Sequence, residues 1–255
     1  MVKRQTRPKK QFDLSIVIPA YREEKRVGKS LDELARYLKT SPVLKTLTVE
    51  VLVVAADAPD KTDEVVLAKT KKYKDLSLLK PGPKVGKGRD VQYGMMRAQG
   101  KAIMFMDADM ATPLKHIDQF YKAFVAGLEI VVGTRNLKKH HPSKFRRAIS
   151  NAGNILFRVL GGVWIEDSQC GFKLFSAEAA QVCFSRLTIM GWGFDMEILA
   201  IAKTNGYKIK TYRVNDWVSV PDGTFLDGVV QTSLKSLQEL FIIFVRRLSG
   251  AYKTK

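Results

Sequence analysis

The sequence predicts an α/β fold in which one largely parallel sheet carries helices on both faces. The first observation is that short runs of consecutive apolar residues alternate with segments of helical periodicity through the first half of the chain. Strands of that kind are buried on both faces by the helices that connect them. The second observation is size, since 255 residues, 45% of them hydrophobic, are enough for one such domain with a large core.

Each expected strand is an apolar or β-branched run that ends at a turn residue or a polar cluster. The first run ends at Pro19, which cannot donate to a sheet ladder. The expected strands are 14–19, 49–54, 76–79, 102–106, 129–133, 172–175 and 208–214. Each expected helix has apolar residues three or four positions apart, as Val27, Leu31 and Leu34 are in the first. The expected helices are 27–39, 62–72, 88–98, 114–126, 144–160, 194–204 and 228–248.

The chain carries 43 Lys and Arg against 25 Asp and Glu, a formal net charge of +18. Such an excess indicates an anionic partner, such as nucleic acid, an anionic membrane or phosphorylated substrates; the alternative is a solubilising surface. A nucleic-acid-binding module would place aromatic residues among its basic runs for stacking. The basic runs 69–74 and 138–147 hold only Tyr73 and Phe145, so we expect no nucleic acid among the partners.

Cysteine and histidine placement gives no metal or disulfide pattern. Cys170 and Cys183 form no CxxC pair and no cluster of zinc-ligand spacing, which fits a reducing compartment. His116, His140 and His141 are expected at the surface, without a role. The basic N-terminal residues lack the apolar region of a secretory signal, and no run reaches the ~18 apolar residues of a membrane span. We therefore expect a soluble protein or one peripheral to a membrane.

An acidic triplet, Asp107-Ala108-Asp109, directly follows the expected strand 102–106. Two carboxylates spaced by one residue at a strand end can point into one cleft, and Mg²⁺ and Mn²⁺ prefer such oxygen ligands, which they share with substrate phosphates. The alternative is that the aspartates cap a loop. The triplet predicts Asp107 and Asp109 as ligands of Mg²⁺ or Mn²⁺.

A basic turn with two glycines, 84–89, leads into the expected helix 88–98. Glycines let the backbone approach an anion, the start of a helix favours negative charge, and lysines supply positive charge. The glycine spacing is neither that of a P-loop nor GxGxxG. The turn makes Lys87 a candidate contact for a bound phosphate, and the alternative is a basic surface turn.

Seven segments, taken in order, resemble glycosyltransferase family 2, and in particular its branch of dolichyl-phosphate β-glucosyltransferases and dolichyl-phosphate mannose synthases. The two most specific are Asp-Ser-Gln-Cys-Gly-Phe-Lys at 167–173 and Trp-Gly-Phe-Asp-Met-Glu at 192–197. The segments are 18–24, 53–62, 86–88, 107–109, 133–135, 167–173 and 192–197. The resemblance runs from about residue 14 to the C-terminus. It implies a GT-A (Rossmann-like) fold, a nucleoside diphosphate sugar donor, a divalent cation and inversion at the anomeric carbon.

The resemblance also implies roles for individual residues. Those assigned to the nucleotide-sugar pocket are Pro19, Tyr21, Glu23, Asp57, Lys87 and Asp107, the last shared with the metal. Asp167, Asp195 and Glu197 are placed near the active cleft as candidate catalytic acids. They could act as a base, orient the sugar or fix basic side chains; capping or structural ion pairing is an equally good explanation for each.

Three residues match positions that hold the acceptor phosphate in lipid-phosphate transferases of the family: Arg135, Arg146 and Ser150. Arg146 and Ser150 are four residues apart, so they share one helix face and could bind one phosphate together. The alternative for Arg146 is one more charge of the basic run. A phosphate acceptor is already ionised near pH 7, so the enzyme needs to position two anions rather than supply a strong base.

The chain departs from the family pattern at two places. Ala55-Ala56 stands where paired aspartates usually follow the second strand, so either Asp57 takes over a contact with the nucleotide base or Asp60 only caps the next helix. The loss also raises the alternative of a catalytically degenerate relative. Ala111 stands where mannose synthases often have glutamine, which favours the glucosyltransferase-like branch and a UDP-sugar over a GDP-sugar.

We divide the chain into a basic tail (1–12), a catalytic domain (13–227) and a C-terminal amphipathic helix (228–255). That helix either lies in a membrane interface, with cations toward anionic lipid, or packs on the core, and both can hold for different faces. The predicted function is transfer of a hexose, with glucose favoured, to a polyprenyl phosphate at the cytoplasmic face of a membrane. The alternative acceptor is a growing glycan.

Overall fold

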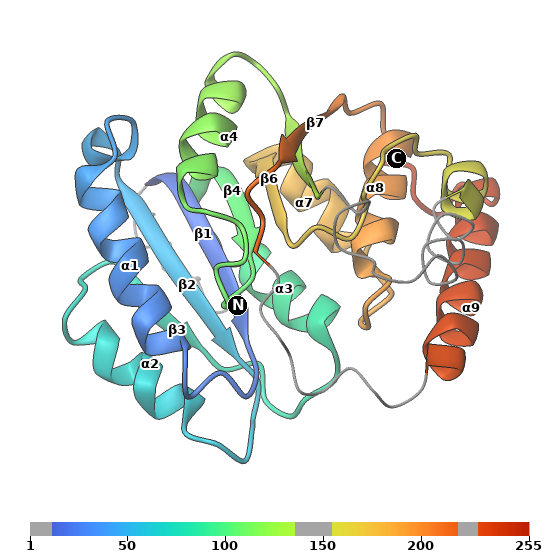
Figure 1. The fold of residues 1–255 in the computed structure, drawn as a ribbon. Coiled ribbons are helices and arrows are strands. Elements are labelled where there is room, and N and C mark those ends of the chain that lie inside the picture. The colour runs from blue at the N-terminus through green and yellow to red at the C-terminus, as the bar shows by residue number, and fades with distance from the viewer. Residues whose placement is uncertain (1–11, 136–154, 219–228, 255) are drawn as a thin grey trace, which may run out of the picture.

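The computed structural model describes residues 12–135, 155–218 and 229–254, with side chains of the last helix from Lys235 onward. Within them, seven strands form one sheet in the order β3-β2-β1-β4-β6-β5-β7 (Figure 1). The strands are β1 (Phe12–Ala20), β2 (Val49–Ala55), β3 (Leu76–Leu79), β4 (Gly100–Met106), β5 (Ile130–Arg135), β6 (Phe172–Ser176) and β7 (Ile209–Val214). β6 is antiparallel to β4 and β5, and the other neighbouring pairs are parallel. The largely parallel sheet is confirmed.

Helices cover both faces of this sheet (Figure 1). The apolar residues of α1, α2 and α4 join one core cluster, and those of α3, α7 and α8 join the other. The helices are α1 (Val27–Thr40), α2 (Thr62–Thr70), α3 (Lys87–Met95), α4 (Lys115–Val125), α7 (Ala177–Ser185), α8 (Phe194–Thr204) and α9 (Val229–Leu248), with a 3₁₀ turn, η1 (Leu44–Thr46), and a helical segment at 155–161.

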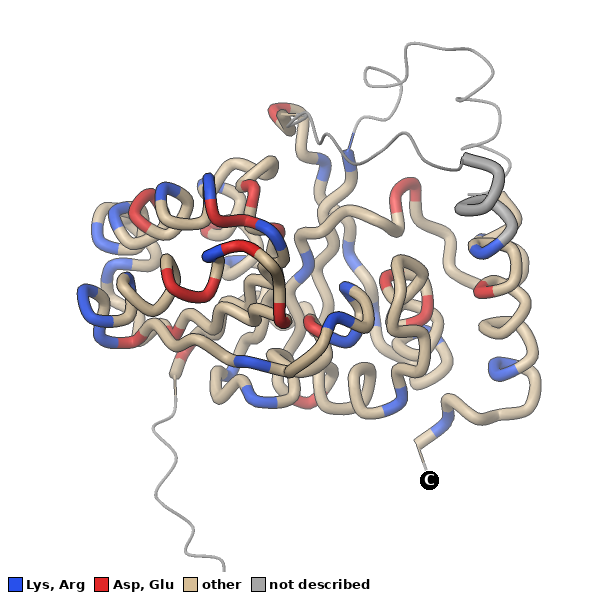
Figure 2. Tube along the Cα trace, turned by 90° about the horizontal axis from the view of Figure 1, so that it is seen from below, with Lys and Arg blue, Asp and Glu red and all other residues tan. Residues whose placement is uncertain are grey.

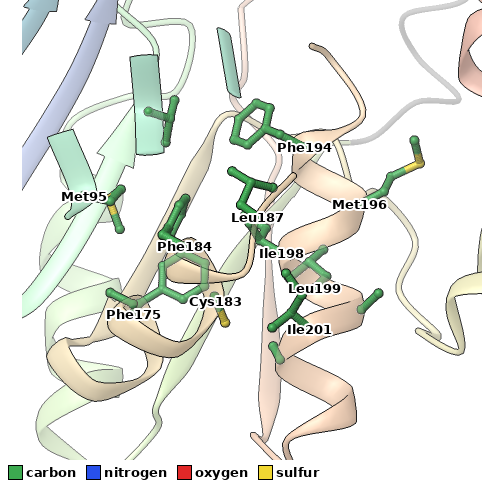
Figure 3. Packing of buried hydrophobic residues seen from close by; sticks show 14 of the residues in the cluster. Met95, Phe175, Cys183, Phe184, Leu187, Phe194, Met196, Ile198, Leu199 and Ile201 are labelled. Carbon is green, nitrogen blue, oxygen red and sulfur yellow. The ribbon is translucent and has the colours of Figure 1, made fainter. Parts of the chain in front are cut away.

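The two cores form on opposite faces because side chains alternate along each strand. In β1, Ile16 enters the cluster under α1, α2 and α4, while Val17 enters the cluster on the other face. Figure 3 shows the second cluster, where Phe184 of α7 and Phe194 of α8 point into the space shared by these helices and the sheet. Their ring centroids lie 6.3 and 5.7 Å from that of Phe105 in β4. This packing fixes the start of α8 against the sheet.

Two local predictions were wrong. Pro19 does not end the first strand, which continues to Ala20 and pairs there with β2. Pairing with β4 stops at Val17, so no ladder bond to that neighbour is required of Pro19. The sequence reading also missed α7, a nine-residue helix that follows β6 directly and is capped by Ser176, whose side chain accepts a hydrogen bond from the Ala179 amide at 3.1 Å. No turn residue separates the strand from the helix.

His116 is buried in the structure, against the expectation of a surface position. Its Nε2 lies 2.7 Å from Oδ1 of Asp216, which satisfies its polarity inside the fold. His140 and His141 lie outside the described residues, as does the expected helix start at 144. Both cysteines are buried and free.

From Lys235 onward, the described side chains of α9 pack on the body of the domain along one stripe. Leu240 and Ile243 are buried in the same core cluster as α8, and Tyr252 beyond the helix joins them. Other apolar residues of the helix, Leu237, Phe241, Ile242, Val245 and Leu248, are exposed. Packing on the core is thus confirmed for one face of the helix. Among the described residues, no helix is both long and apolar enough to cross a membrane.

The charge of the described chain is distributed over many elements. Figure 2 shows Lys and Arg on helices and loops across the molecule, with Asp and Glu on many of the same segments. Many of the basic groups are paired at the surface, as Lys69 is with Asp32 at 2.6 Å and Lys80 with Asp63 at 2.6 Å. The anion-binding groups must therefore be identified from the geometry of individual sites.

Candidate active site

Charged side chains gather at the edge of the sheet where the parallel strands end. Asp107 and Asp109 follow β4, and Arg135 is the last residue of β5. Because β6 is antiparallel to β4, its amino end lies at the same edge, and the Asp107 amide donates to the Gly171 carbonyl at 3.2 Å. Ligands of open α/β sheets bind beyond the carboxyl ends of the strands. These residues therefore define the candidate active site.

A hollow at this edge is lined by the acidic loop, the end of β5, the start of β6 and the segment after β7. Its lining residues are Met106, Asp107, Asp109, Met110, Ala111, Thr112, Arg135, Gly171, Phe172 and Trp217. The segment after β7 is fastened to the acidic loop, because the Val218 amide donates to the Ala111 carbonyl at 3.0 Å. This contact brings Trp217 to a site whose other residues lie far from it in sequence.

The Asp107 carboxylate contacts Lys87 on one side and packs against Gly171 on the other. Its Oδ1 is 2.5 Å from the Nζ of Lys87. A Cβ at Gly171 would overlap the Asp107 carboxylate, so glycine is required there for the loop before β6 to approach so closely. The segment 167–173, which the sequence singled out, thus serves the acidic triplet directly.

Asp109 accepts a hydrogen bond from the Ala111 amide at 3.0 Å. Burial, followed by the nearby charge of Asp107, raises the pKa of Asp109. Met110, which directly follows Asp109 in the turn, has a left-handed backbone with φ of 54°, which is uncommon for a residue with a side chain and is often found at functional sites. The turn therefore holds two carboxylates together at an electrostatic cost.

The donor set of this turn fits a divalent cation that also binds a substrate. Within the described residues, no group of three or more His, Cys, Asp and Glu side chains is placed to hold a metal. Mg²⁺ commonly uses one or two carboxylates and completes its octahedron with water and substrate phosphates. Asp107 and Asp109 match that smaller set, and the repulsion between them is what a bound cation would remove.

Lys87 is held in place by backbone packing. Side chains at Gly86 or Gly88 would collide with the backbone around Met190, so the turn and the 189–191 segment touch without intervening side chains. The ammonium group lies 5.3 Å from the centre of the Trp192 ring. Burial opposes its charge, but Asp107 and Asp195 outweigh burial and raise the pKa of Lys87. Lys87 is therefore a fixed cation beside the acidic triplet.

Arg135 is fixed by Asp167. Its Nε and Nη2 donate to the two carboxylate oxygens at 2.7 and 3.0 Å, and its amide donates to Oδ2 at 3.0 Å. Burial alone would raise the pKa of Asp167, but Arg135 outweighs it and holds that pKa below its usual value. Burial likewise opposes the charge of Arg135, and Asp167 raises its pKa. The ring of Trp217 covers the guanidinium at 5.4 Å.

Asp195 lies beneath the site rather than on its surface. It is 2% exposed and is ion-paired with Lys173, whose side chain is fully buried and also donates to the Cys170 carbonyl at 2.7 Å. Its charge acts on Lys87. The structure therefore brings Asp195 close to the site as a buried partner of two lysines.

Glu197 is placed away from any open surface. Its Oε2 accepts from the Thr188 and Ile189 amides at 2.9 and 2.6 Å, and its Oε1 accepts from the Thr188 and Tyr252 hydroxyls at 2.7 and 2.8 Å. Arg246 lies 3.8 Å from the same carboxylate. These contacts tie the 186–193 loop, α8 and the C-terminal residues together, which matches the structural alternative for this residue.

The expected nucleotide residues surround the end of β1. Lys84 Nζ lies 4.4 Å from the centre of the Tyr21 ring, and Pro19 is half-buried in the strand. Glu23 pairs with Arg26 and its amide donates to Thr62 Oγ1 at 2.8 Å. These contacts join the first loop to the start of α2.

The unusual Ala55-Ala56 pair is buried, and the two aspartates that follow differ in their surroundings. Asp57 is exposed, its amide donates to the Gly82 carbonyl at 3.0 Å, and its carboxylate lies 4.0 Å from Lys80. Asp60 accepts from the Thr62 amide at 3.3 Å and hydroxyl at 2.9 Å, and from the Glu24 amide at 3.2 Å. Asp60 thus organises the start of α2, and Asp57 is the aspartate open to a ligand.

Two of the predicted acceptor residues are not placed by the structure, and two tryptophans beside the site were not predicted from the sequence. Arg146 and Ser150 lie outside the described residues. Trp192 belongs to the 192–197 segment, but the sequence indicated no role for it. Trp217 is one of the 3 tryptophans of the chain and lies in no motif. Their proximity to Lys87 and Arg135 depends on tertiary contacts between distant segments.

Comparison with known proteins agrees with this geometry. The sequence profile of Glycosyl transferase family 2 matches residues 15–184. The chain belongs to glycosyltransferase family 2. Dolichyl-phosphate beta-glucosyltransferases of Trichomonas vaginalis, Mus musculus and Homo sapiens are 34%, 33% and 32% identical to it, over 95%, 97% and 96% of this chain and 76%, 79% and 78% of their own lengths. The resemblance read from the motifs is confirmed, and the chain is a glycosyltransferase.

Solved structures confirm the GT-A fold. Glucosyl-3-phosphoglycerate synthase from Mycobacterium tuberculosis, in complex with Mn²⁺, uridine diphosphate and phosphoglyceric acid, superposes with a TM-score of 0.66 at 16% identity, covering 91% of this chain and 78% of its own. A mannosyltransferase from Pyrobaculum calidifontis, in complex with GDP-Man and Mn²⁺, gives 0.60 at 19% identity, covering 94% and 66%. At these identities the likeness concerns the fold alone.

Proposed function

We propose that this family 2 glycosyltransferase moves a hexose, with glucose favoured, from a nucleoside diphosphate sugar to a polyprenyl phosphate, with inversion at the anomeric carbon. The observation that carries the proposal is the meeting of the acidic pair with two fixed cations, Lys87 and Arg135, at one edge of the sheet. Such a site suits two phosphorylated ligands. Similarity to dolichyl-phosphate β-glucosyltransferases over most of the chain supports the sugar and the acceptor.

The donor would lie with its base near Tyr21 and its diphosphate at the acidic triplet. Asp107 and Asp109 would hold Mg²⁺ or Mn²⁺, whose charge stabilises the departing nucleoside diphosphate when the ion is bound. Lys87 adds a positive charge next to Asp107. A UDP-sugar is favoured over a GDP-sugar because Ala111, which lines the hollow, departs from the glutamine typical of mannose synthases.

The acceptor requires positioning more than deprotonation. A phosphate monoester is ionised near neutral pH, so its oxygen is already a nucleophile, and the enzyme must hold it in line against a negatively charged donor. Arg135 lines the hollow while Asp167 fixes the direction of its guanidinium, so its charge is preorganised for an anion. Arg146 and Ser150 remain proposed partners of the same phosphate.

The three acidic residues expected to be catalytic receive supporting tasks in this scheme. Asp167 orients Arg135, and Asp195 holds Lys173 and adds negative charge behind Lys87. Glu197 fixes the 186–193 loop. None of these tasks removes a proton from the acceptor, in keeping with its ionised state.

Membrane contact is proposed for the outer face of α9, at the cytoplasmic side of the bilayer. Leu237, Phe241, Val245 and Leu248 recur at intervals of four, four and three residues and are all exposed, so they form one apolar stripe on the helix surface. Arg246 and Arg247 approach Glu197 and the Leu160 carbonyl of the domain, so the exposed Lys253 beyond the helix is the cation proposed to face anionic headgroups.

The proposal is tested by sugar transfer from UDP-glucose, UDP-galactose, GDP-mannose and GDP-glucose to a short polyprenyl phosphate, with Mn²⁺, Mg²⁺ or a chelator. We expect glucosyl polyprenyl phosphate from UDP-glucose, dependent on the metal and lost in Asp109→Asn. The matched control is Asp63→Asn, because Asp63 is ion-paired with Lys80 on the surface of α2.

Each other outcome overturns a defined part of the proposal. Transfer only to a soluble sugar or glycan would remove the lipid acceptor and favour the glycan alternative. Transfer from a GDP-sugar alone would overturn the donor preference. Absence of both nucleotide binding and turnover would make the chain a degenerate relative, with Ala55-Ala56 the first position to revert.

A further inference from the structure

Trp192 presents a large apolar surface at the entrance to a highly charged site. It is 62% exposed, and its ring lies next to Lys87, the partner of Asp107. An indole exposed to this extent beside an ion pair gains little from the fold itself, since burial is what makes apolar surface favourable. Its position indicates contact with a ligand that has both charge and apolar surface.

The loop that carries Trp192 is fixed from below. Glu197 accepts hydrogen bonds from the Thr188 and Ile189 amides, and the Arg89 amide donates to the Met190 carbonyl at 3.3 Å. The first contact ties the loop to α8 and the second ties it to the first turn of α3. Trp192 is therefore presented in a defined place relative to Lys87.

The same loop touches α9 on its other side. A Cβ at Gly193 would collide with the Glu239 carboxylate, and one at Gly191 would lie 3.8 Å from the Nζ of Lys235. Glycine on both sides of Trp192 thus allows α9 to approach the loop. The loop that carries the indole therefore contacts both the start of α3, where Lys87 lies, and the helix whose outer face is the proposed membrane contact.

We propose that Trp192 contacts the first isoprene units of the polyprenyl phosphate while the phosphate faces Arg135. This inference rests on the proposed function. A polyprenyl phosphate joins one anionic group to a long apolar chain, and the chain has to pass from the charged site toward the bilayer. The indole supplies apolar surface at the point where the chain leaves the charged site, next to α9. A hexose can also stack on an indole. If the hexose of the nucleotide sugar did so here, Trp192 would be a contact of that sugar rather than of the lipid.

The test uses the full-length enzyme in detergent with saturating UDP-glucose and farnesyl phosphate as the varied acceptor. Trp192→Ala should raise the KM for farnesyl phosphate roughly tenfold or more, as expected for the loss of a large apolar contact, with kcat and the KM for UDP-glucose little changed. Trp192→Phe should restore most of the affinity, because it keeps an aromatic surface. Trp164→Ala is the matched control, since Trp164 is 76% exposed and follows the 155–161 helix.

Three outcomes would overturn the inference. A rise in the KM for UDP-glucose or a change in donor hydrolysis, with the acceptor KM unchanged, would assign the indole to the hexose. Equal kinetics of Trp192→Ala and Trp164→Ala would show that the indole contacts neither substrate. A wild-type enzyme that glycosylates no isoprenyl phosphate would overturn the proposed function itself, and the inference with it.

Discussion

At the scale of single residues, the site contains two carboxylates whose repulsion destabilises the folded state and an ion pair that stabilises it. Asp107 and Asp109 are held together by a turn with a left-handed Met110, whereas Asp167 and Arg135 neutralise each other with two side-chain hydrogen bonds. The first pair leaves an electrostatic demand for a cation, and the second satisfies its own. In the proposed function the first pair binds the cation, and the second presents Arg135 in a fixed direction to an anion.

Asp109→Asn should therefore make the metal-free protein more stable and the enzyme less active. Removing one of two neighbouring partly buried charges should raise the thermal midpoint of the metal-free protein by roughly 1–3 °C, the scale expected for a fraction of a kcal/mol in a protein of this size. Metal-dependent turnover should fall about 100-fold or more, as when one transition-state electrostatic contact is lost. Thermal unfolding with and without Mn²⁺, beside turnover, measures both effects. A lower midpoint with unchanged turnover would contradict the assignment of Asp109 to the metal.

Asp167 should make a pH-dependent contribution to stability. Its pKa in the folded protein is below the unfolded value, so its stabilisation is complete above about pH 4 and is lost as the pH falls through the folded pKa. Asp167→Asn leaves Arg135 unpaired and should lower the free energy of unfolding by about 3 kcal/mol at pH 7, with a smaller difference at pH 3. Urea titrations at both values measure it. Glu166→Gln is the control, because Glu166 is in an exposed ion pair with Arg213, and its free energy of unfolding should change little. A loss of stability in Asp167→Asn that is the same at both pH values would contradict the lowered pKa of Asp167.

At the scale of elements, the segment after β7 completes the hollow and is held by one ionic cluster. Asp216 pairs with Lys115 and with His116 of α4, and hydrogen bonds from these two side chains lower its pKa to about 2. Asp216 is therefore ionised throughout the neutral range. Its neighbour Trp217 lines the hollow, so α4 positions a wall of the site without touching a substrate.

Asp216→Asn should loosen this wall. The Val218 amide, which donates to Ala111, should exchange its hydrogen faster, because local opening becomes easier when a fastening contact is weakened. Turnover should fall several-fold while binding of Mn²⁺ and nucleotide changes less, since neither Asp107 nor Asp109 is moved. Hydrogen exchange of 215–218 beside steady-state kinetics makes the measurement, with Asp63→Asn as control. Unchanged exchange in Asp216→Asn would show that the cluster does not hold the segment.

The same elements show what sequence could predict. β4 was found because its apolar run is continuous and the acidic triplet follows it, and both signals are local. His116 and Asp216 are 100 positions apart, and nothing in either neighbourhood indicates the other. Glu197 belongs to a sequence motif, yet its four hydrogen bonds, from Thr188, Ile189 and Tyr252, depend on tertiary packing. Local pattern thus predicts which side chains lie at the candidate edge of the sheet, and long-range contacts determine their partners.

At the scale of the whole molecule, the proposed function requires the candidate active site and the outer face of α9 to bind one substrate together. The 186–193 loop connects them through Glu197 and through the close approach of Gly193 to Glu239. An acceptor whose phosphate must reach Arg135 while its chain stays in lipid would require the enzyme to dock with α9 toward the bilayer. The net charge of +18 would assist such docking on anionic lipid, and this assistance would weaken with salt.

Replacing Phe241 and Val245 together by serine should separate docking from chemistry. Both are exposed on the outer stripe of α9, so the double variant should fold normally and bind liposomes containing anionic lipid about tenfold more weakly, through lost burial of apolar surface. Turnover of farnesyl phosphate in detergent should stay unchanged. Cosedimentation with liposomes at low and high salt measures the first effect, and Leu67→Ser, at an exposed apolar position on α2, is the matched control. Equal binding by the double variant and the control would remove α9 from the contact and leave the basic side chains as the remaining source of any affinity for anionic lipid.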